Sequence, residues 1–399
     1  MNLTPSQERA FNFLDKFCGS PISSDQNENE VILTGSPGYG KSFLIDYLKK
    51  KHKNIEITAT TNKAADIIDG VTIYSLLGLK LKDNYKTGES DIDYENARNL
   101  YNEIVVIDEC SMINQELFVA IHTYMKKCKI IYVGDYYQLP PVKNENFSIF
   151  NIGLTLLELT EPCRTDKSDI LNLMNILKDC IKQNVLYKNL VPSENINFIT
   201  DPKDLETHLI NFEPIIDKCL SFTNKNVENQ NFLIRDLHLL DHKFGVNDYV
   251  VCKSAVPTII NGYKMLSKIE SVMKITSISK TDSNGCARIQ CDNGGSYKVF
   301  LTPFTYTKRL NELADIAKKA VNPKERREKW KEFFNFKNSI LDIRDIYAST
   351  VHSAQGSTYR NVYIDLRDLW TCPNKRELQR LLYVAVSRAK ENVYFILLK

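Results

Sequence analysis

The chain has 399 residues, 43% of them hydrophobic and 25% charged, which is ordinary globular usage and excludes a disordered or collagen-like chain. Its formal net charge of +3 is too close to balance for a polybasic binder, so a polyanionic partner has to meet local basic patches. No apolar run approaches the ~20 residues of a membrane helix, and the N-terminus carries no secretion signal. We therefore expect a cytoplasmic protein that does not bind membranes.

The ten cysteines are scattered along the chain, and none of them form a CxxC pair. In a chain of this length they indicate reduced, buried thiols, as in a cytosolic protein. Cys286 and Cys291 are the closest pair, but no second Cys or His pair follows at zinc spacing, so a metal finger is disfavoured.

Short apolar runs alternate with helical segments at both ends of the chain. The candidate strands are 31–35, 55–60, 103–108 and 129–135 in the first part, and 219–224, 361–366 and 392–398 in the last. This alternation predicts an α/β protein in which parallel sheets are covered by helices on both faces.

The middle of the chain has a different texture. Residues 248–304 contain short alternating strands broken by NG, DSNG and DNGG turns, which predicts a small antiparallel barrel, and 305–338 form a charged helical stretch. A polar segment with a KTGE turn, at about 80–100, is a further candidate insertion. The domains expected from this pattern are 1–154, with the small insertion about 80–100; 155–247 together with 340–399; and 248–339 as an insertion.

A glycine-rich segment follows the first candidate strand and opens a helix. It matches GxxxxGK[ST] over Gly35, Ser36, Pro37, Gly38, Tyr39, Gly40, Lys41 and Ser42. Glycines let successive backbone N–H groups curl around phosphate oxygens, and the helix N-terminus adds partial positive charge. We expect Lys41 to reach the β- and γ-phosphates of ATP and the Ser42 hydroxyl to ligate Mg²⁺.

Two adjacent carboxylates, Asp108 and Glu109, end the candidate strand 103–108. Carboxylates at the end of a buried strand are costly to desolvate unless a cation is present. Asp108 therefore fits a direct or indirect role at Mg²⁺, and Glu109 fits polarisation of the attacking water. Together with the glycine-rich segment, this pair predicts hydrolysis of a nucleoside triphosphate.

Three further residues suggest that hydrolysis is coupled to movement. Gln138 lies just past the strand 129–135, where it could sense the γ-phosphate. Arg164 follows a short strand, and Arg388 lies among apolar residues near the C-terminus. An arginine supplied by a second domain accelerates phosphoanhydride hydrolysis by about 10³–10⁵ and makes catalysis depend on closure.

Taken in order, the motifs resemble those of superfamily 1 helicases, and specifically the 1B branch that contains RecD, Pif1 and the phage Dda helicases. The segments that carry the resemblance are GSPGYGKS, VIDECSM, VGDYYQLPPV, TVHSAQGST and YVAVSRAK, and the resemblance spans about 3–399. The T-x-H-x-x-Q-G form at 350–356 is more similar to the 5′→3′ branch than to the UvrD-like 3′→5′ branch. The compact length is most like the Dda enzymes, which are phage proteins.

The resemblance implies a role for each matching residue. Gln7 resembles the glutamine that reads adenine, and Gly356 belongs to a motif at the nucleotide side. The ATP-site roles fall to Lys41, Ser42, Asp108, Glu109, Gln138, Arg164 and Arg388, and the DNA contacts to Thr61, Asn62, Tyr74, Thr350 and His352. Asn62 and Tyr74 each replace a more usual His, so Tyr74 would stack on a base or simply pack.

The resemblance implies two RecA-like P-loop domains, a small pin and an SH3-like barrel with a helical insertion. It implies an ATP- and Mg²⁺-dependent DNA helicase that moves 5′→3′ on single-stranded DNA and displaces the complementary strand of a forked duplex. Tyr85 is a candidate tip of the pin, and the barrel is a candidate clamp on DNA or binding site for partners. We expect a monomer, with a single-strand-binding or replication protein as a candidate partner in replication, recombination or repair.

Other readings stay open. The motor could have the opposite polarity or use RNA, because no residue discriminates the 2′-hydroxyl. A P-loop phosphotransferase would explain Lys41 and Asp108 but not a second α/β unit that carries Arg388. A non-hydrolysing nucleic-acid-binding module is disfavoured because both Glu109 and Arg388 are present.

Overall fold

The structure is a computed structural model that describes residues 3–83, 90–140, 147–163, 167–260, 263–283 and 285–398. The chain divides into two compact units. The first comprises Met1–Leu79, Glu95–Val227 and Ser349–Lys399, and the second comprises Lys80–Tyr94 and Glu228–Ala348. The first unit contains two separate sheets, which we call the first and second lobes.

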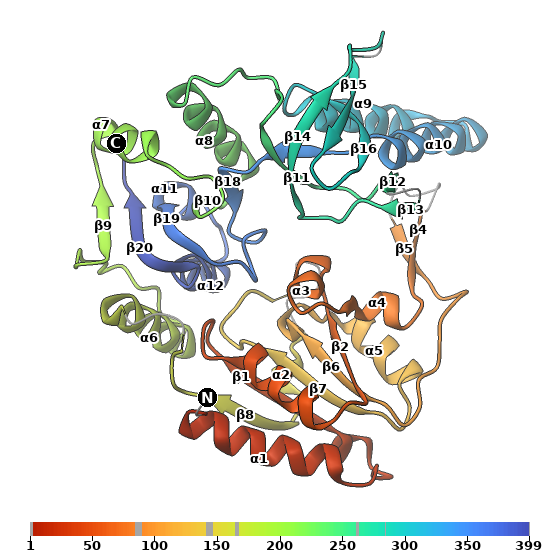
Figure 1. Ribbon diagram of the computed structural model, residues 1–399, viewed down its shortest axis with the longest axis vertical. Coiled ribbons are helices and arrows are strands. Elements are labelled where there is room, and N and C mark those ends of the chain that lie inside the picture. The colour runs from red at the N-terminus through yellow and green to blue at the C-terminus, as the bar shows by residue number, and fades with distance from the viewer. Residues whose placement is uncertain are drawn as a thin grey trace. The chain divides into compact units, whose positions relative to one another are not determined.

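The first lobe is built on a six-stranded sheet with the order β3-β2-β6-β7-β1-β8, in which every pair is parallel (Figure 1). Every residue of β1 and β7 is buried, as expected for a parallel sheet with both faces covered. The strands are β1 (Glu30–Gly35), β2 (Ile55–Ala59), β3 (Val71–Thr72), β6 (Ile104–Asp108), β7 (Lys129–Gly134) and β8 (Thr155–Leu159). The helices are α1 (Pro5–Gly19), α2 (Lys41–Lys51), α3 (Asn62–Ile67), α4 (Ile73–Leu76) and α5 (Gln115–Tyr124), with 3₁₀ turns at Gln26–Asn29, Cys110–Met112 and Ile149–Asn151.

The second lobe is built on a five-stranded sheet with the order β18-β10-β19-β20-β9. The pairs β10–β19, β19–β20 and β20–β9 are parallel. Its strands are β9 (Ile196–Ile199), β10 (Asp217–Ser221), β18 (Ala348–Thr350), β19 (Tyr359–Asp365) and β20 (Ala389–Ile396). Its helices are α6 (Ser168–Gln183), α7 (Pro202–Ile210), α11 (Leu366–Leu369) and α12 (Lys375–Val386), and α8 (Asn224–Leu237) leads out of it. The predicted α/β class with two parallel-sheet lobes is confirmed.

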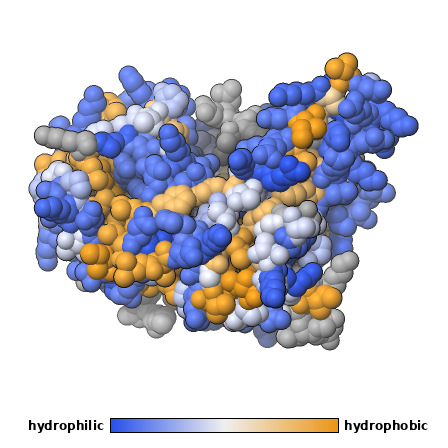
Figure 2. All heavy atoms as spheres, turned by 90° about the horizontal axis from the view of Figure 1, so that it is seen from above, coloured by the Kyte–Doolittle hydropathy of each residue, from blue (hydrophilic) through white to orange (hydrophobic). Residues whose placement is uncertain are grey.

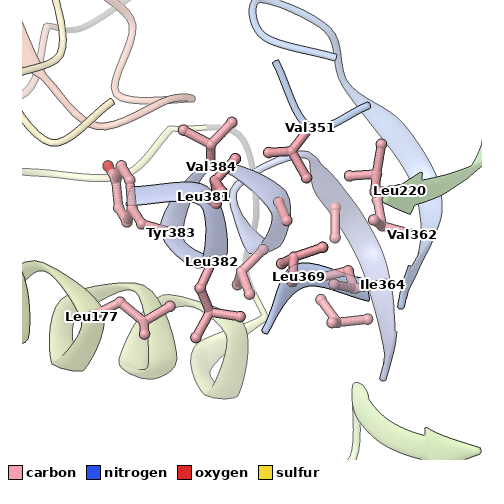
Figure 3. Packing of buried hydrophobic residues seen from close by; sticks show 14 of the residues in the cluster. Leu177, Leu220, Val351, Val362, Ile364, Leu369, Leu381, Leu382, Tyr383 and Val384 are labelled. Atoms are coloured by element: carbon pink, nitrogen blue, oxygen red, sulfur yellow. The ribbon is translucent and has the colours of Figure 1, made fainter. Parts of the chain in front are cut away.

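Apolar residues of α12 and of the sheet form the core of the second lobe (Figure 3). Leu381, Leu382 and Val384 pack among Val362 and Ile364 of β19. Tyr383 lies at one end of this cluster, and its phenolic oxygen points away from the neighbouring leucines (Figure 3). Burial of aliphatic side chains, at about 25 cal/mol per Å², holds α12 on its sheet. The Tyr383 hydroxyl is the polar group at the end of this apolar cluster.

The second unit contains an antiparallel sheet with the order β16-β15-β14-β11-β17. Its strands are β11 (Tyr249–Cys252), β14 (Val272–Ile278), β15 (Cys286–Cys291), β16 (Ser296–Phe300) and β17 (Ile343–Asp345), and β12 (Pro257–Ile260) pairs with β13 (Tyr263–Leu266). The helices α9 (Thr305–Lys319) and α10 (Pro323–Ser339) follow. The predicted antiparallel strands and charged helices are present, while the SH3-like topology stays a prediction.

The small insertion is a hairpin of β4 (Lys80–Asp83) and β5 (Ser90–Asp93). Its strands pair antiparallel, with Lys80 opposite Asp93. Tyr85, the candidate tip of the pin, lies outside the described residues.

A buried arginine ties together segments of the second unit. The Arg235 guanidinium donates to Asp345 Oδ1 at 2.9 Å and to Asp248 Oδ2 at 2.8 Å. It also donates to the carbonyl oxygens of Asp241 and Lys243. A charge taken out of water is tolerated only when paired in this way, and here one cation is satisfied by two carboxylates and two carbonyl groups.

The described part of the chain contains no helix that is both long enough and apolar enough to cross a bilayer. Figure 2 shows apolar patches on one face, each bordered by hydrophilic residues. Within the described residues, no three His, Cys, Asp or Glu side chains are grouped so that they could hold a metal ion.

Candidate nucleotide site

The glycine-rich loop between β1 and α2 depends on two left-handed backbone positions. Gly38 has φ +83° and Gly40 has φ +80°, which glycine adopts at little cost. A Cβ atom at Gly40 would lie 2.3 Å from Gln7 Nε2, so the end of that side chain would have to move, and the positive φ would strain any other residue there. The Lys41 ammonium donates to the carbonyl oxygens of Gly35, at 2.6 Å, and Ser36, at 3.2 Å. The loop thus presents the N-terminus of α2 and its lysine on the same side.

The two carboxylates lie at the carboxyl end of β6, next to this loop. Asp108 Oδ1 accepts the backbone N–H of Glu109 at 2.8 Å, and Glu109 itself has φ +54°. Burial raises the pKa of Asp108. Burial, and then the charge of Asp108, raise the pKa of Glu109 to about 7, while Lys41 and Arg388 oppose the rise. A left-handed glutamate costs about 1–3 kcal/mol, the kind of strain found at functional positions.

A cavity of about 380 Å³ brings most of the predicted residues together. It is lined by residues of both lobes. Gly356, with φ +78°, brings second-lobe backbone beside Glu109, and a Cβ atom there would lie in ordinary van der Waals contact with Glu109 Oε1, at 3.5 Å. The predicted residues that line it are Pro37, Gly38, Gly40, Lys41, Ser42, Asp108, Glu109, Gln138, Gly356 and Arg388. Gly35, Ser36 and Tyr39 belong to the loop but are not part of the lining.

Arg388 reaches this cavity from the second lobe, two residues after the end of α12. Its side chain is only 2% exposed and donates to Ser357 O at 3.1 Å and to Ser387 Oγ at 2.9 Å. These contacts hold the guanidinium inside the protein, facing the same space as Lys41 and Glu109. Arg164, the other predicted arginine, lies outside the described residues.

Gln138 is buried beside the cavity with half of its amide unsatisfied. Its Nε2 donates weakly to Asp135 Oδ2 at 3.4 Å. Its Oε1 has no hydrogen-bond partner in the described part of the chain. An unsatisfied buried acceptor costs about 1–3 kcal/mol, which favours a ligand that could donate to it or arrange water around it.

Gln7 lies behind the loop rather than in the cavity lining. It is buried, closes a capping box with Thr4 at the start of α1, and donates through Nε2 to Tyr39 O at 3.2 Å and Cys163 Sγ at 3.4 Å. Its amide is therefore fixed at one end of the glycine-rich loop, and it is not a solvated surface residue.

Contacts between the lobes include residues to which the sequence assigned no role. Tyr383 Oη donates to Asp135 Oδ2 at 2.8 Å, and both residues are buried. Arg380 Nη1 donates to the carbonyl oxygens of Tyr136, at 2.5 Å, and Gln138, at 2.6 Å. Arg380 and Tyr383 are three residues apart on α12, a spacing that places them on one helix face and could have indicated a shared partner.

The predicted DNA contacts lie outside the nucleotide cavity. Thr61 caps α3 by accepting the N–H of Ala64, Asn62 is exposed, and Tyr74 is half-buried in α4. Thr350 hydrogen-bonds Ser353.

His352 pairs with Glu377 at 3.2 Å and lines a second cavity, of about 420 Å³, beside Tyr136, Phe147 and Phe150. Gln138 lines this cavity as well. The two cavities therefore share one residue.

One lobe carries a phosphate-binding loop, and the other supplies a buried arginine to the same cavity. These features define a P-loop nucleoside triphosphatase with two RecA-like lobes. Family models match at both ends of the chain, an AAA domain over residues 20–144 and a UvrD-like helicase C-terminal domain over residues 345–396.

Relatives extend along nearly the whole length. The chain is 23% identical to the ATP-dependent DNA helicase dda of Enterobacteria phage T4, covering 99% of both chains. It is 25% identical to the ATP-dependent DNA helicase Pif1 of Campylobacter jejuni, covering 90% of this chain and 87% of the relative.

Solved structures share the fold. The Pif1 helicase of Candida albicans matches with a TM-score of 0.54 at 17% identity, over 99% of this chain and 95% of that one. Bacteroides Pif1 bound to single-stranded DNA matches with a TM-score of 0.52 at 18% identity, over 99% and 92%. The predicted resemblance to superfamily 1B helicases of the RecD/Pif1 branch is confirmed by these relatives, which are named ATP-dependent DNA helicases and match nearly the whole chain.

Proposed function

We propose that the chain is an ATP-dependent DNA helicase that moves 5′→3′ on single-stranded DNA and displaces the complementary strand. The observation that carries the proposal is Arg388, which the second lobe supplies to the cavity lined by Lys41 and Glu109. Because an arginine at the transferred phosphate contributes about 10³–10⁵ in rate, hydrolysis depends on the two lobes being together. Full-length relatives named as ATP-dependent DNA helicases support the same activity.

In this proposal the phosphates of ATP lie against the glycine-rich loop. Lys41 neutralises charge on the β- and γ-phosphates, and Gln7 reads the base from behind the loop. The Ser42 hydroxyl and the Asp108 carboxylate fit Mg²⁺ because both are hard oxygen ligands that line the same cavity. Mg²⁺, when bound there, would stabilise negative charge on the phosphate oxygens. Glu109 orients the attacking water, and Arg164 assists Arg388.

Loss of the γ-phosphate weakens the contacts that hold the lobes together, and alternating grip on the strand turns this change into a step. Thr61, Asn62, Tyr74, Thr350 and His352 are the proposed contacts to single-stranded DNA. Backbone contacts and base stacking dominate, so little sequence preference is expected. The T-x-H-x-x-Q-G form at 350–356 supports 5′→3′ movement.

The domain assignment is part of the proposal, with lobes at 1–154 and at 155–247 plus 340–399, and an insertion at 248–339. One observation modifies it, because β8 (Thr155–Leu159) pairs with β1 and extends the first sheet beyond residue 154. The hairpin of β4 and β5 is the proposed wedge, and the insertion 248–339 is a proposed clamp or partner site. Deletion of 81–95 should abolish unwinding at unchanged ATPase, and intact unwinding would reject the wedge.

The polarity test uses forked duplexes that carry only a 5′ or only a 3′ single-stranded tail. We expect displacement from the 5′-tailed substrate alone, by the monomer, and a single-strand-binding or replication protein is the proposed partner. Displacement only from the 3′-tailed substrate would show the opposite polarity. Displacement only of RNA substrates would show that the motor moves on RNA. ATPase that rises with a small-molecule acceptor, but not with single-stranded DNA, would favour a phosphotransferase.

A further inference from the structure

Cys163 is the one exposed thiol among the ten cysteines, all of which lie in described residues. Eight of the others are buried, and Cys180 is half-buried. The position of Cys163 is fixed because its backbone N–H donates to Gly38 O of the glycine-rich loop at 2.8 Å. Its Sγ accepts from Gln7 Nε2 at 3.4 Å, and the residue lines the nucleotide cavity beside Gly40 and Lys41.

An independent observation marks this cavity as a ligand site. Gln138 lines it, is 4% exposed, and has an Oε1 without a hydrogen-bond partner in the described residues. A buried acceptor in this condition requires a ligand or ordered water, whatever the cysteine does. Phe43, which is 37% exposed, adds an aromatic face to the lining. The thiol is therefore at the wall of a built site and not at an isolated surface position.

We propose that Cys163 is a thiol-modification site where a mixed disulfide and a bound nucleotide exclude each other. The inference rests on the proposed nucleotide site. The co-reactant is an anionic low-molecular-weight disulfide of the glutathione class, whose carboxylates pair with Lys41 and Arg388 in a cavity that Asp108 and Glu109 also line. The Cys163 thiol loses its proton to solvent, and its sulfur attacks one sulfur of the disulfide. One S–S bond forms as another breaks, and the departing thiolate takes up a proton.

The position of the Cys163 sulfur explains why the mixed disulfide and a bound nucleotide exclude each other. The cavity of about 380 Å³ is near the lower end of the ~300–1,000 Å³ range for ligand pockets, so it does not hold a peptide adduct and a nucleotide together. The adduct would also displace the Gln7 amide from Sγ, and that amide contacts the loop at Tyr39 O. The modification thus acts on the loop that holds the phosphates.

The test treats the full chain with glutathione disulfide and follows adducts by peptide mass spectrometry. Nucleotide binding is measured separately with a fluorescent ATP analogue. We expect the fastest adduct at Cys163, formed about tenfold more slowly when ADP is present at about ten times its Kd. The modified protein should lose binding of the analogue, and reduction with dithiothreitol should restore it.

Two variants make the test specific. Cys180→Ser is the matched control, because it removes the half-buried thiol and should keep both the adduct and the loss of binding. Cys163→Ala should bind the analogue equally well before and after treatment, whatever its own affinity. Modified Cys163 that still binds nucleotide, or labelling that ADP does not slow, overturns the inference alone. Unmodified protein that does not bind the analogue overturns the proposed function as well.

Discussion

The hydrogen bond from Tyr383 to Asp135 joins the two lobes and can be removed without disturbing the core. Tyr383→Phe deletes only the hydroxyl, because the ring is fully buried in the apolar cluster around α12 and stays there. Asp135 then still accepts a hydrogen bond from the backbone N–H of Tyr137 at 2.9 Å and a weak one from the Gln138 side chain. A hydrogen bond to a charged group contributes about 1.5–3 kcal/mol, so closure should weaken by about that amount.

The assay is a double-mutant cycle on DNA-stimulated ATPase, with Tyr383→Phe, Asp135→Asn and the double variant. Because about 1.4 kcal/mol corresponds to a factor of ten, Tyr383→Phe should lower kcat by about tenfold or more if open lobes lack the bond. The double variant should then lose much less than the sum of the single losses. Tyr363→Phe is the matched control, since the Tyr363 ring is also buried in the second lobe and its hydroxyl has no hydrogen bond in the described residues.

Additive losses in the cycle, or equal kcat for Tyr383→Phe and Tyr363→Phe, would refute the reasoning. The first result would mean that the two groups do not interact during turnover. The second would mean that closure does not limit hydrolysis.

Further predictions test the site and the folded state. Lys41→Ala should abolish ATPase and leave single-stranded DNA binding intact, and substantial residual turnover would contradict the phosphate site. Arg388→Ala should still bind a fluorescent ATP analogue but lose hydrolysis by about 10³-fold or more, whereas a mild loss would make the arginine structural. Arg235→Ala should lower the unfolding free energy of the second unit by about 3–5 kcal/mol in urea, because two carboxylates lose their cation. Burial lowers the pKa of His122, but the hydrogen bond and charge of Glu30 outweigh burial and raise it overall. The stability from this pair is therefore present at low pH and lost as pH rises through the raised pKa, and His122→Gln should remove that loss from urea titrations at pH 6 and 8.

Local sequence was sufficient for the parts of the site that are local in the fold. The segment from Gly35 to Ser42 carries its own geometry, because glycine permits the two left-handed positions and Lys41 begins the helix. The buried strands were also readable, since continuous apolar runs with parallel neighbours are buried on both faces. The edge strand of the first sheet could not be predicted, because β8 is half exposed and the residues that pair it with β1 are more than a hundred positions apart in sequence.

Contacts between the lobes could not be predicted from local sequence. Tyr383 and Asp135 are 248 residues apart, and nothing in either segment specifies the other. Cys163 likewise gives no local signal, because its place on the cavity wall depends on a hydrogen bond to Gly38 across the fold. Arg388 was predicted because it is an arginine among apolar residues near the C-terminus, whereas Arg380, eight residues earlier, was missed.

Gln138 connects the two cavities through its own bonds. Its backbone carbonyl accepts Arg380, and its side-chain amide donates to Asp135, which also accepts Tyr383. A ligand that satisfies Oε1 in the nucleotide cavity therefore acts on a residue that Arg380 holds directly and that Tyr383 holds through Asp135. Gln138 also lines the cavity beside His352. A ligand that shifts the Gln138 side chain would therefore also change the surroundings of the proposed DNA contact. Coupling of this kind needs only one side chain with competing partners, and no long pathway through either core.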